Sequence, residues 1–327
     1  MARRRERKFG TLIWRRLVRM LITIVLVVTL TYLLLDLIPG NPAYSMLPQD
    51  QLTPANIAQV DHQLGLDKPF FARMGLWALH ALQGNLGVSY QNSQPVASLI
   101  VSRLPVTLEL MILAQLIGLV LALAIALVSV NQRRKVTSGF STLFTVISLS
   151  LPNFILALVL VLIFAVKLHW FPATGFTPLS QSLSGNVSSM ILPSLALGVG
   201  TAAVYAQVLS AELSKTLQQD FVQFAIAKGL PRRTVLLRHA LRPSALPLVT
   251  LAGLNVGILL GGSFIIETIF ALPGIGALAV NAIYSKDYLV VQGVVLFVTV
   301  SYVLINFAVD LLYSVVDPRV RRNAGAS

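Results

Sequence analysis

The chain has 327 residues, of which 56% are hydrophobic and only 11% charged, and its formal net charge is +13. Soluble domains carry about 25% charged residues, so this composition indicates an integral membrane protein. The absence of cysteine excludes disulfides, thiolate metal sites and a cysteine nucleophile. The basic residues form short clusters beside apolar stretches, which is typical of the cytoplasmic flanks of membrane helices and argues against a nucleic-acid-binding face.

Catalytic and metal-binding motifs are missing from the sequence. It contains neither an H-E-x-x-H zinc motif nor a G-x-x-x-x-G-K-[ST] phosphate-binding loop. The four histidines are scattered without the spacing of metal ligands: His62, His80, His169 and His239. The sequence therefore predicts no metal site and no ATP hydrolysis in this chain.

Six stretches reach the length of about 20 apolar residues that a helix needs to cross a bilayer. They are residues 17–38, 104–130, 140–166, 190–210, 245–266 and 289–316. The first has a longer apolar core than a signal peptide and no clear cleavage site after it, so we expect it to be retained. The predicted fold class is an all-α, polytopic membrane protein with six transmembrane helices.

The distribution of basic residues predicts the orientation of these spans. All but five of the 25 Lys and Arg residues fall on one face, which the positive-inside rule makes cytoplasmic, together with both termini. The five exceptions are Lys68, Arg73, Arg103, Lys167 and Lys286. The predicted organisation is a basic cytoplasmic N-terminus (1–16), a first span (17–38), an extracytoplasmic segment (39–103), a core of five spans (104–316) containing a cytoplasmic loop (211–244), and a cytoplasmic tail (317–327).

The extracytoplasmic segment predicts two short amphipathic helices with a break at residues 65–69. Thr53 is a suitable N-cap and Pro54 suits the first helical position. Trp77 would anchor the second helix at the membrane interface. The alternative is that the two helices form a packing cap over the helix bundle.

Polar and small residues within the spans leave three classes of membrane protein open: a subunit of a pump powered by another chain, an ion-coupled secondary transporter, and an intramembrane enzyme. The carboxylates lie near span ends and only neutral Asn153 and Asn255 lie near the middle, which disfavours ion coupling. Gly253, Gly257 and Gly261 recur at four-residue spacing, which is typical of close helix packing and is also compatible with a substrate path.

The cytoplasmic loop interrupts the apolar chain with a basic, glycine-broken helical pair. Residues 212–228 predict one continuous helix with an apolar stripe, ended by Gly229 at positive φ with Lys228 in the last turn. The stripe consists of Phe221, Val222, Phe224 and Ala225. A second helix begins after Pro231, with Val235, Leu236, Ala240 and Leu241 on one face and Arg232, Arg233, Arg238 and Arg242 around it. This loop is interpreted either as a lipid-binding interfacial element or as a helix that inserts into a groove of another protein.

The loop sequence DFVQFAIAKGLPRRTVLLRHALRPSALP resembles the cytoplasmic coupling loop of ABC importer permeases, more narrowly those for dipeptides, oligopeptides and nickel. The resemblance extends over nearly the whole chain, through LIPGNP, RLPVTLEL, SLPNF, GGSFIIETIFALPGIG and VDLLYSVVDPRVR. In the family, the pattern E-A-A-x-x-x-G marks the helix that docks on an ATPase subunit. Here Ala225 and Gly229 match it, while Gln223 and Phe224 replace the Glu and first Ala, and Pro243 stands where Asn is usual.

The resemblance implies a type I ABC importer permease fold in the bacterial inner membrane, without catalysis in this chain. The implied partners are a second homologous permease, two cytoplasmic ATPase subunits that bind ATP and Mg, an extracytoplasmic binding protein, and membrane lipid. The residues expected to couple to the ATPase are Asp220, Phe221, Phe224, Ala225, Lys228 and Gly229. Peptides are the first implied substrate, with nickel, glutathione or another small solute as alternatives.

Overall fold

The computed structural model describes residues 2–37, 49–63, 67–131, 143, 145–148 and 150–316. Within these ranges the regular elements are helices, apart from one isolated β-bridge between Val88 and Pro95. The predicted all-α class is therefore confirmed for the described part of the chain. The tail predicted at 317–327 lies outside the described residues. In the described part of the chain, five helices are long and apolar enough to cross a membrane: Val18–Leu35, Val96–Val130, Leu183–Leu217, Arg232–Ile269 and Tyr288–Val309.

The third predicted span, 140–166, is described only in part, because residues 140–142, 144 and 149 lie outside the described residues. Residues 143, 145–148 and 150 are helical, and the helix is interrupted at Leu151 and Pro152. Helical backbone resumes as α7 (Asn153–Leu160) and continues as the π-helical segment η2 (Val161–Lys167). Pro152 is extended, with ψ 141°, directly before α7. Since a proline disfavours helical backbone in the residue before it, Pro152 explains why α7 starts there.

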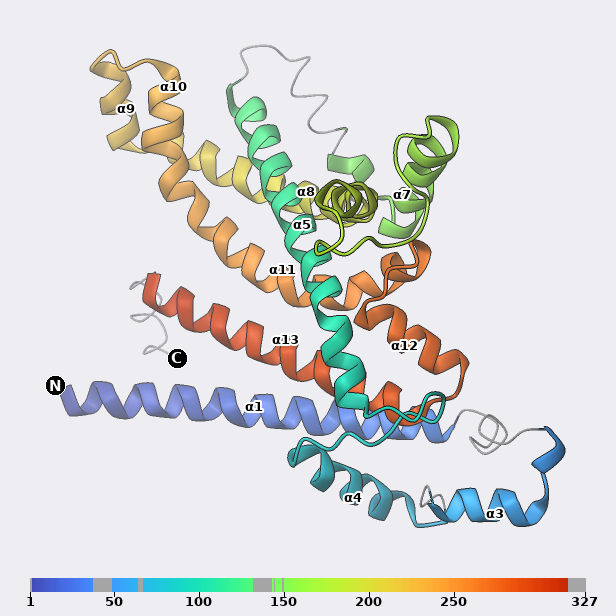
Figure 1. The fold of residues 1–327 in the computed structure, drawn as a ribbon. Coiled ribbons are helices and arrows are strands. Elements are labelled where there is room, and N and C mark those ends of the chain that lie inside the picture. Colours follow the sequence, from blue (N-terminus) through green and yellow to red (C-terminus); the bar gives the residue numbers. More distant parts are fainter. Residues whose placement is uncertain are drawn as a thin grey trace. The chain divides into compact units, whose positions relative to one another are not determined.

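The chain folds into two compact units, residues 1–105 with 274–307 and residues 106–273 with 308–327. The first holds α1 (Ala2–Asp36), η1 (Gln49–Gln51), α3 (Pro54–Gln63), α4 (Phe70–Leu82), the start of α5 (Val96–Asn131), α12 (Ile275–Tyr284) and most of α13 (Tyr288–Val316) (Figure 1). The second holds the rest of α5, α7, η2, α8 (Leu183–Leu217), α9 (Asp220–Ala227), α10 (Arg232–Thr234), the π-helical η3 (Val235–Ala240), α11 (Leu241–Ile269) and the end of α13.

In the first unit, the two short helices predicted for the extracytoplasmic segment are α3 and α4. Pro54 is the first residue of α3, and the Thr53 hydroxyl accepts a hydrogen bond from the Asn56 amide at 3.3 Å. Both features confirm the predicted helix start, because a side-chain oxygen at this position satisfies an amide that has no helical partner.

The prediction that Trp77 anchors α4 at the membrane interface is wrong. Trp77 is buried, and its ring lies 5.6 Å from that of Tyr32 in α1, centre to centre. Phe70 contacts the same tyrosine at 6.2 Å. Aromatic edge-to-face pairs of this kind contribute about 0.5–1.5 kcal/mol beyond area burial. This face of α4 therefore packs as a cap on α1, and its opposite face leaves Phe71 and Leu82 exposed.

The second unit is built around α5, α8 and α11, which cross one another in Figure 1. Glycine allows α5 and α8 to approach closely: a Cβ added to Gly198 would lie 2.9 Å from the Ala114 carbonyl oxygen. The core between the helices combines five alanines with four large side chains: Ala122, Ala126, Tyr205, Ala206, Leu209, Leu213, Ala240, Leu248 and Ala252. Small residues at helix contacts are typical of membrane bundles, where close van der Waals packing drives association.

Candidate functional site

The loop that is predicted to be cytoplasmic forms a compact helical hairpin, residues 218–240, here called the α9 hairpin. The prediction of one continuous helix over 212–228 is wrong, because α8 ends at Leu217 and α9 begins at Asp220. Gln219 between them is extended, with ψ 145°. The Gln223 side-chain amide donates to the Leu217 carbonyl oxygen at 2.7 Å and so satisfies an acceptor at the end of α8. Gln223 occupies the position where the family pattern has Glu.

The predicted apolar stripe of α9 is divided between two faces. Val222 and Ala225, with exposed fractions of 0% and 5%, pack against Val235 of η3. Phe221 and Phe224 lie on the outside, 51% and 62% exposed. The expectation that Ala225 lies on the face that enters a partner's groove is therefore wrong. Its small side chain instead permits the close packing of α9 on η3, and the face offered to the solvent is aromatic.

The turn after α9 has the backbone predicted for it. Gly229 has φ +77°, which confirms its expected left-handed conformation. Its amide donates to the Ile226 carbonyl at 2.9 Å and the Leu230 amide donates to the Ala225 carbonyl at 3.3 Å, which together make a Schellman motif. Nothing lies within 4 Å of the position a Cβ would take at Gly229, so the turn requires glycine for its backbone angles and not for space.

Charged residues of α9 flank its exposed aromatic face. The Lys228 ammonium lies 4.5 Å from the centre of the Phe224 ring, a cation–π contact that fixes both side chains on the outer face. Asp220 is in the first turn of α9, where its charge stabilises the helix dipole. The predicted coupling residues other than Ala225 thus lie on the exposed side or at the ends of α9.

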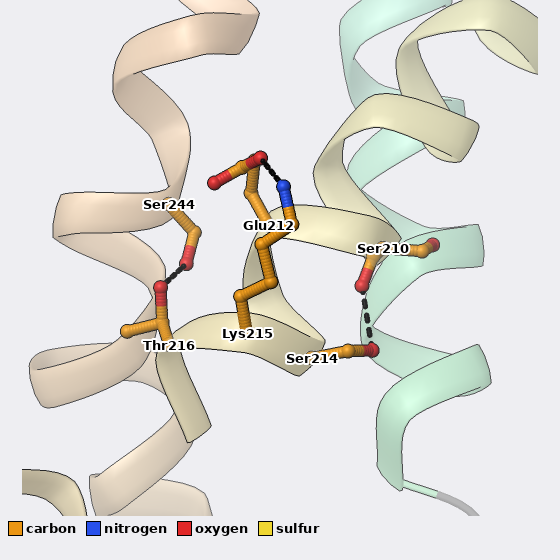
Figure 2. A network of polar contacts seen from close by, with 6 residues as sticks. All are labelled: Ser210, Glu212, Ser214, Lys215, Thr216 and Ser244. Atoms are coloured by element: carbon orange, nitrogen blue, oxygen red, sulfur yellow. Dashed lines mark hydrogen bonds and ion pairs between the residues drawn. The ribbon is translucent and has the colours of Figure 1, made fainter. Parts of the chain in front are cut away.

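One hydrogen bond joins α8 and α11 at the base of the α9 hairpin. Figure 2 shows Ser244 of α11 meeting Thr216 of α8, with 2.8 Å between their hydroxyl oxygens. Both residues are buried. Glu212 and Lys215 form an ion pair of 2.7 Å at the exposed end of α8, and Ser214 donates to the Ser210 carbonyl at 2.8 Å (Figure 2). The bond between Ser244 and Thr216 therefore ties together the two helices that the α9 hairpin joins, while the other two contacts lie within α8.

The second helix of the loop begins after Pro231, as predicted, and Val235, Leu236 and Ala240 are buried on its inner face. It is not a separate element, however, because helical backbone runs without a break from Arg232 to Ile269. The Arg232 guanidinium donates to the Val130 carbonyl at the end of α5, at 3.2 Å. A movement of the α9 hairpin would therefore be transmitted directly along α11.

A second candidate site lies among α7, α8 and α11, where an open pocket of about 320 Å³ collects residues from all three. It brings together Asn153 and Asn255, both predicted near the middle of their spans, and we call it the asparagine pocket. Its lining is Ser148, Leu151, Pro152, Asn153, Leu197, Gly200, Thr201, Val204, Asn255, Ile258, Leu259 and Gly262.

The glycines predicted for α11 have different surroundings. A Cβ at Gly253 would lie 2.6 Å from a methyl group of Val309, so this glycine serves close packing against the end of α13. Gly257 is buried. Gly261 has no atom within 4 Å of a Cβ position and is exposed. The stripe is thus a packing surface at one end and an open surface at the other.

Sequence reasoning missed four residues of these sites: Gly200, Thr216, Ser244 and Gln115. Gln115 of α5 donates to the Ala252 carbonyl of α11 at 3.1 Å and accepts from the Tyr205 hydroxyl of α8 at 3.1 Å. A glutamine within an apolar span is a detectable signal, because a buried amide needs partners. Thr216 and Ser244 are 28 positions apart, and nothing in the sequence indicates that they pair.

Comparison with known proteins relates the chain to transport proteins over nearly its full length. Residues 116–322 match the family model of the binding-protein-dependent transport system inner membrane component, and residues 9–111 match the N-terminal model of the same membrane components. A putative peptide transport system permease protein of Brucella abortus (strain 2308) is 37% identical over 311 residues, covering 95% of this chain and 98% of the relative.

Two further similar proteins are named for other substrates. A glutathione transport system permease protein of Escherichia coli O6:H1 is 34% identical over 307 residues, covering 94% of this chain and 97% of that one. A crystal structure of an amino acid ABC transporter with histidines has a TM-score of 0.48 at 18% identity, over 68% of this chain and 94% of that chain. From the matching family models and the full-length relatives, this multi-pass protein of the bacterial plasma membrane belongs to the family of binding-protein-dependent transport system inner membrane components, the permeases of ABC importers.

Proposed function

We propose that the chain is a permease subunit of an ATP-driven importer of dipeptides or oligopeptides, and that the outer face of α9 docks on a cytoplasmic ATPase. The observation that best supports docking is the pair of exposed aromatic side chains, Phe221 and Phe224, on a helix that lies between α8 and α11 in the chain. Large exposed apolar side chains on a rigid, projecting helix suit insertion into a protein groove.

The remaining parts of the proposed complex are a second homologous permease, a second ATPase and an extracytoplasmic binding protein. ATP and Mg would be bound by the ATPases, and this chain would carry out no covalent chemistry. Binding energy released at the ATPases would move the α9 hairpin and, through the continuous helix 232–269, the lining of the asparagine pocket. Peptide import is favoured over nickel because a relative that is 37% identical over 311 residues is named as a putative peptide transport system permease protein.

The experiment is uptake by vesicles that contain the chain together with its companion permease, ATPases and binding protein. We expect ATP-dependent uptake of radiolabelled trialanine by the complex and no ATP hydrolysis by the purified chain. Nickel and glutathione, tested at equal concentration, distinguish the alternative substrates. Uptake of nickel or glutathione without uptake of any peptide would refute the peptide assignment.

A further inference from the structure

The asparagine pocket has a neutral polar lining with two carboxamides. Asn153 comes from the first turn of α7 and Asn255 from α11, with α8 contributing the wall between them. None of the described residues that line it is charged, and the other polar side chains are Ser148 and Thr201. The pocket therefore offers hydrogen-bond donors and acceptors without attracting either sign of charge.

Gly200 of α8 makes room for the Asn153 side chain. A Cβ added to Gly200 would collide with Asn153 Oδ1, and the amide carbon of Asn153 would lie 3.4 Å away. Any side chain at residue 200 would therefore displace the carboxamide from its place in the pocket. Glycine at residue 200 therefore leaves the space that the Asn153 carboxamide occupies.

Asn255 has a buried Nδ2 donor that makes no hydrogen bond of standard distance and angle with the described residues. Its side chain lies beside the Tyr205 hydroxyl, which interacts with Asn255 and donates to Gln115. Gln115 is itself bonded to the Ala252 carbonyl. This network holds the carboxamide in place from the α5 side. A buried donor without an acceptor is costly, and such atoms in native structures are commonly completed by a ligand or water.

We propose that Asn153 and Asn255 bind the backbone amide groups of a peptide as it passes through the membrane part of the transporter. This inference rests on the proposed peptide import and adds the recognition chemistry. A carboxamide offers the same donor and acceptor as a peptide group, so the two pair irrespective of the peptide's side chains. Apolar wall residues such as Leu197 and Ile258 leave room for varied side chains. Weak, neutral contacts also suit a path, because a substrate must leave it again.

The first test replaces Asn255 by Leu, which has a similar volume and no amide, in the complete transporter. We expect trialanine uptake to fall at least tenfold, while ATP turnover stimulated by the liganded binding protein stays within twofold of wild type. Asn306→Leu is the matched control, because it removes a buried amide of α13 that does not line the pocket, and it should retain uptake. Normal uptake by Asn255→Leu would overturn the inference, as would an equal loss of uptake and stimulated ATP turnover.

The second test uses the cysteine-free sequence. Ile258 and Val249 both lie on α11 and are 61% and 66% exposed, but only Ile258 lines the pocket. In the assembled transporter, trialanine and its binding protein should slow thiol labelling of Ile258→Cys during turnover and leave Val249→Cys unchanged. Equal labelling of Ile258→Cys with and without peptide would count against the site. If the wild-type complex imports no peptide at all, the proposed peptide import is refuted. If it imports peptide but the Ile258→Cys labelling is unaffected, only the binding role of the asparagine pocket is refuted.

Discussion

The α9 hairpin and the asparagine pocket lie in the same compact unit, but the hairpin exposes aromatic side chains and the pocket exposes polar ones. In the hairpin, polar side chains such as Gln223 satisfy the backbone, while aromatic rings face outward. In the pocket, aliphatic side chains form much of the wall and two carboxamides with two hydroxyl side chains supply the polar groups. One of these carboxamides has a buried donor without a hydrogen bond of standard geometry. A lasting protein contact is stabilised by apolar burial, whereas a transient substrate needs contacts that exchange readily. The difference suggests a permanent partner at the hairpin and a passing one at the pocket.

Replacement of Ala225 by Glu should have the largest effect, because it places a charge between α9 and η3 in the cluster with Val222 and Val235. Burying an unpaired polar or charged group costs several kcal/mol, about 2–7 for polar groups alone. We expect the α9 hairpin to detach and become sensitive to limited proteolysis of the purified transporter, with loss of uptake.

Ala227→Glu is the matched control, because Ala227 is exposed on the same helix. It should leave the protease resistance of the hairpin unchanged. Equal protease resistance of Ala225→Glu and wild type would show that Ala225 does not hold α9 on η3.

Replacement of Gly229 by Val should have the next largest effect. A β-branched residue at φ +77° stores about 1–3 kcal/mol of backbone strain. Gly229→Asn should be milder, since Asn tolerates this conformation better. Uptake in reconstituted vesicles should fall in the order wild type, Asn, Val, and equal uptake by all three would contradict the strained turn.

Removal of the Ser244 hydroxyl should have the smallest effect. Ser244→Ala loses the hydrogen bond between α11 and α8 that Figure 2 shows, worth about 1 kcal/mol, and leaves the Thr216 hydroxyl buried. We expect a thermal unfolding midpoint a few degrees lower. In a double-mutant cycle with Thr216→Val, the two losses should not be additive; strict additivity would mean that the pair contributes nothing.

Much of the fold follows from the sequence, because hydropathy and turn residues are local signals. Five of the six predicted long apolar helices, the start of α3 at Pro54 and the positive φ of Gly229 are confirmed in the described residues, while the third span contains only a shorter apolar helix, Asn153–Lys167. The membrane orientation, and the coupling roles assigned to α9, stay predictions. Helix ends are less accurate: α5 begins at Val96 and not at 104, because the helix continues before the predicted span through residues whose apolar members Val96, Leu99 and Ile100 are buried.

The errors concern which way a side chain faces, which depends on distant parts of the chain. Trp77 and Ala225 were both expected on outer surfaces, and each is buried by a residue from another element, Tyr32 and Val235 respectively. Periodicity places residues on one face of a helix without saying what that face contacts. The asparagine pocket could not be predicted for the same reason. Asn153 and Asn255 are recognisable in the sequence as polar residues within spans, but their proximity depends on the packing of α7, α8 and α11.

The most direct measurement of the central claim is recovery of the ATPase with an affinity-tagged permease that carries Phe221→Ala and Phe224→Ala together. Both rings are exposed, so their removal should leave the unfolding temperature of the permease unchanged. An aromatic anchor at an interface contributes about 2 kcal/mol or more, which corresponds to roughly 30-fold weaker binding. The account predicts a permease that inserts normally but retains little ATPase and imports no peptide. Full ATPase recovery with this double variant would contradict docking through the outer face of α9.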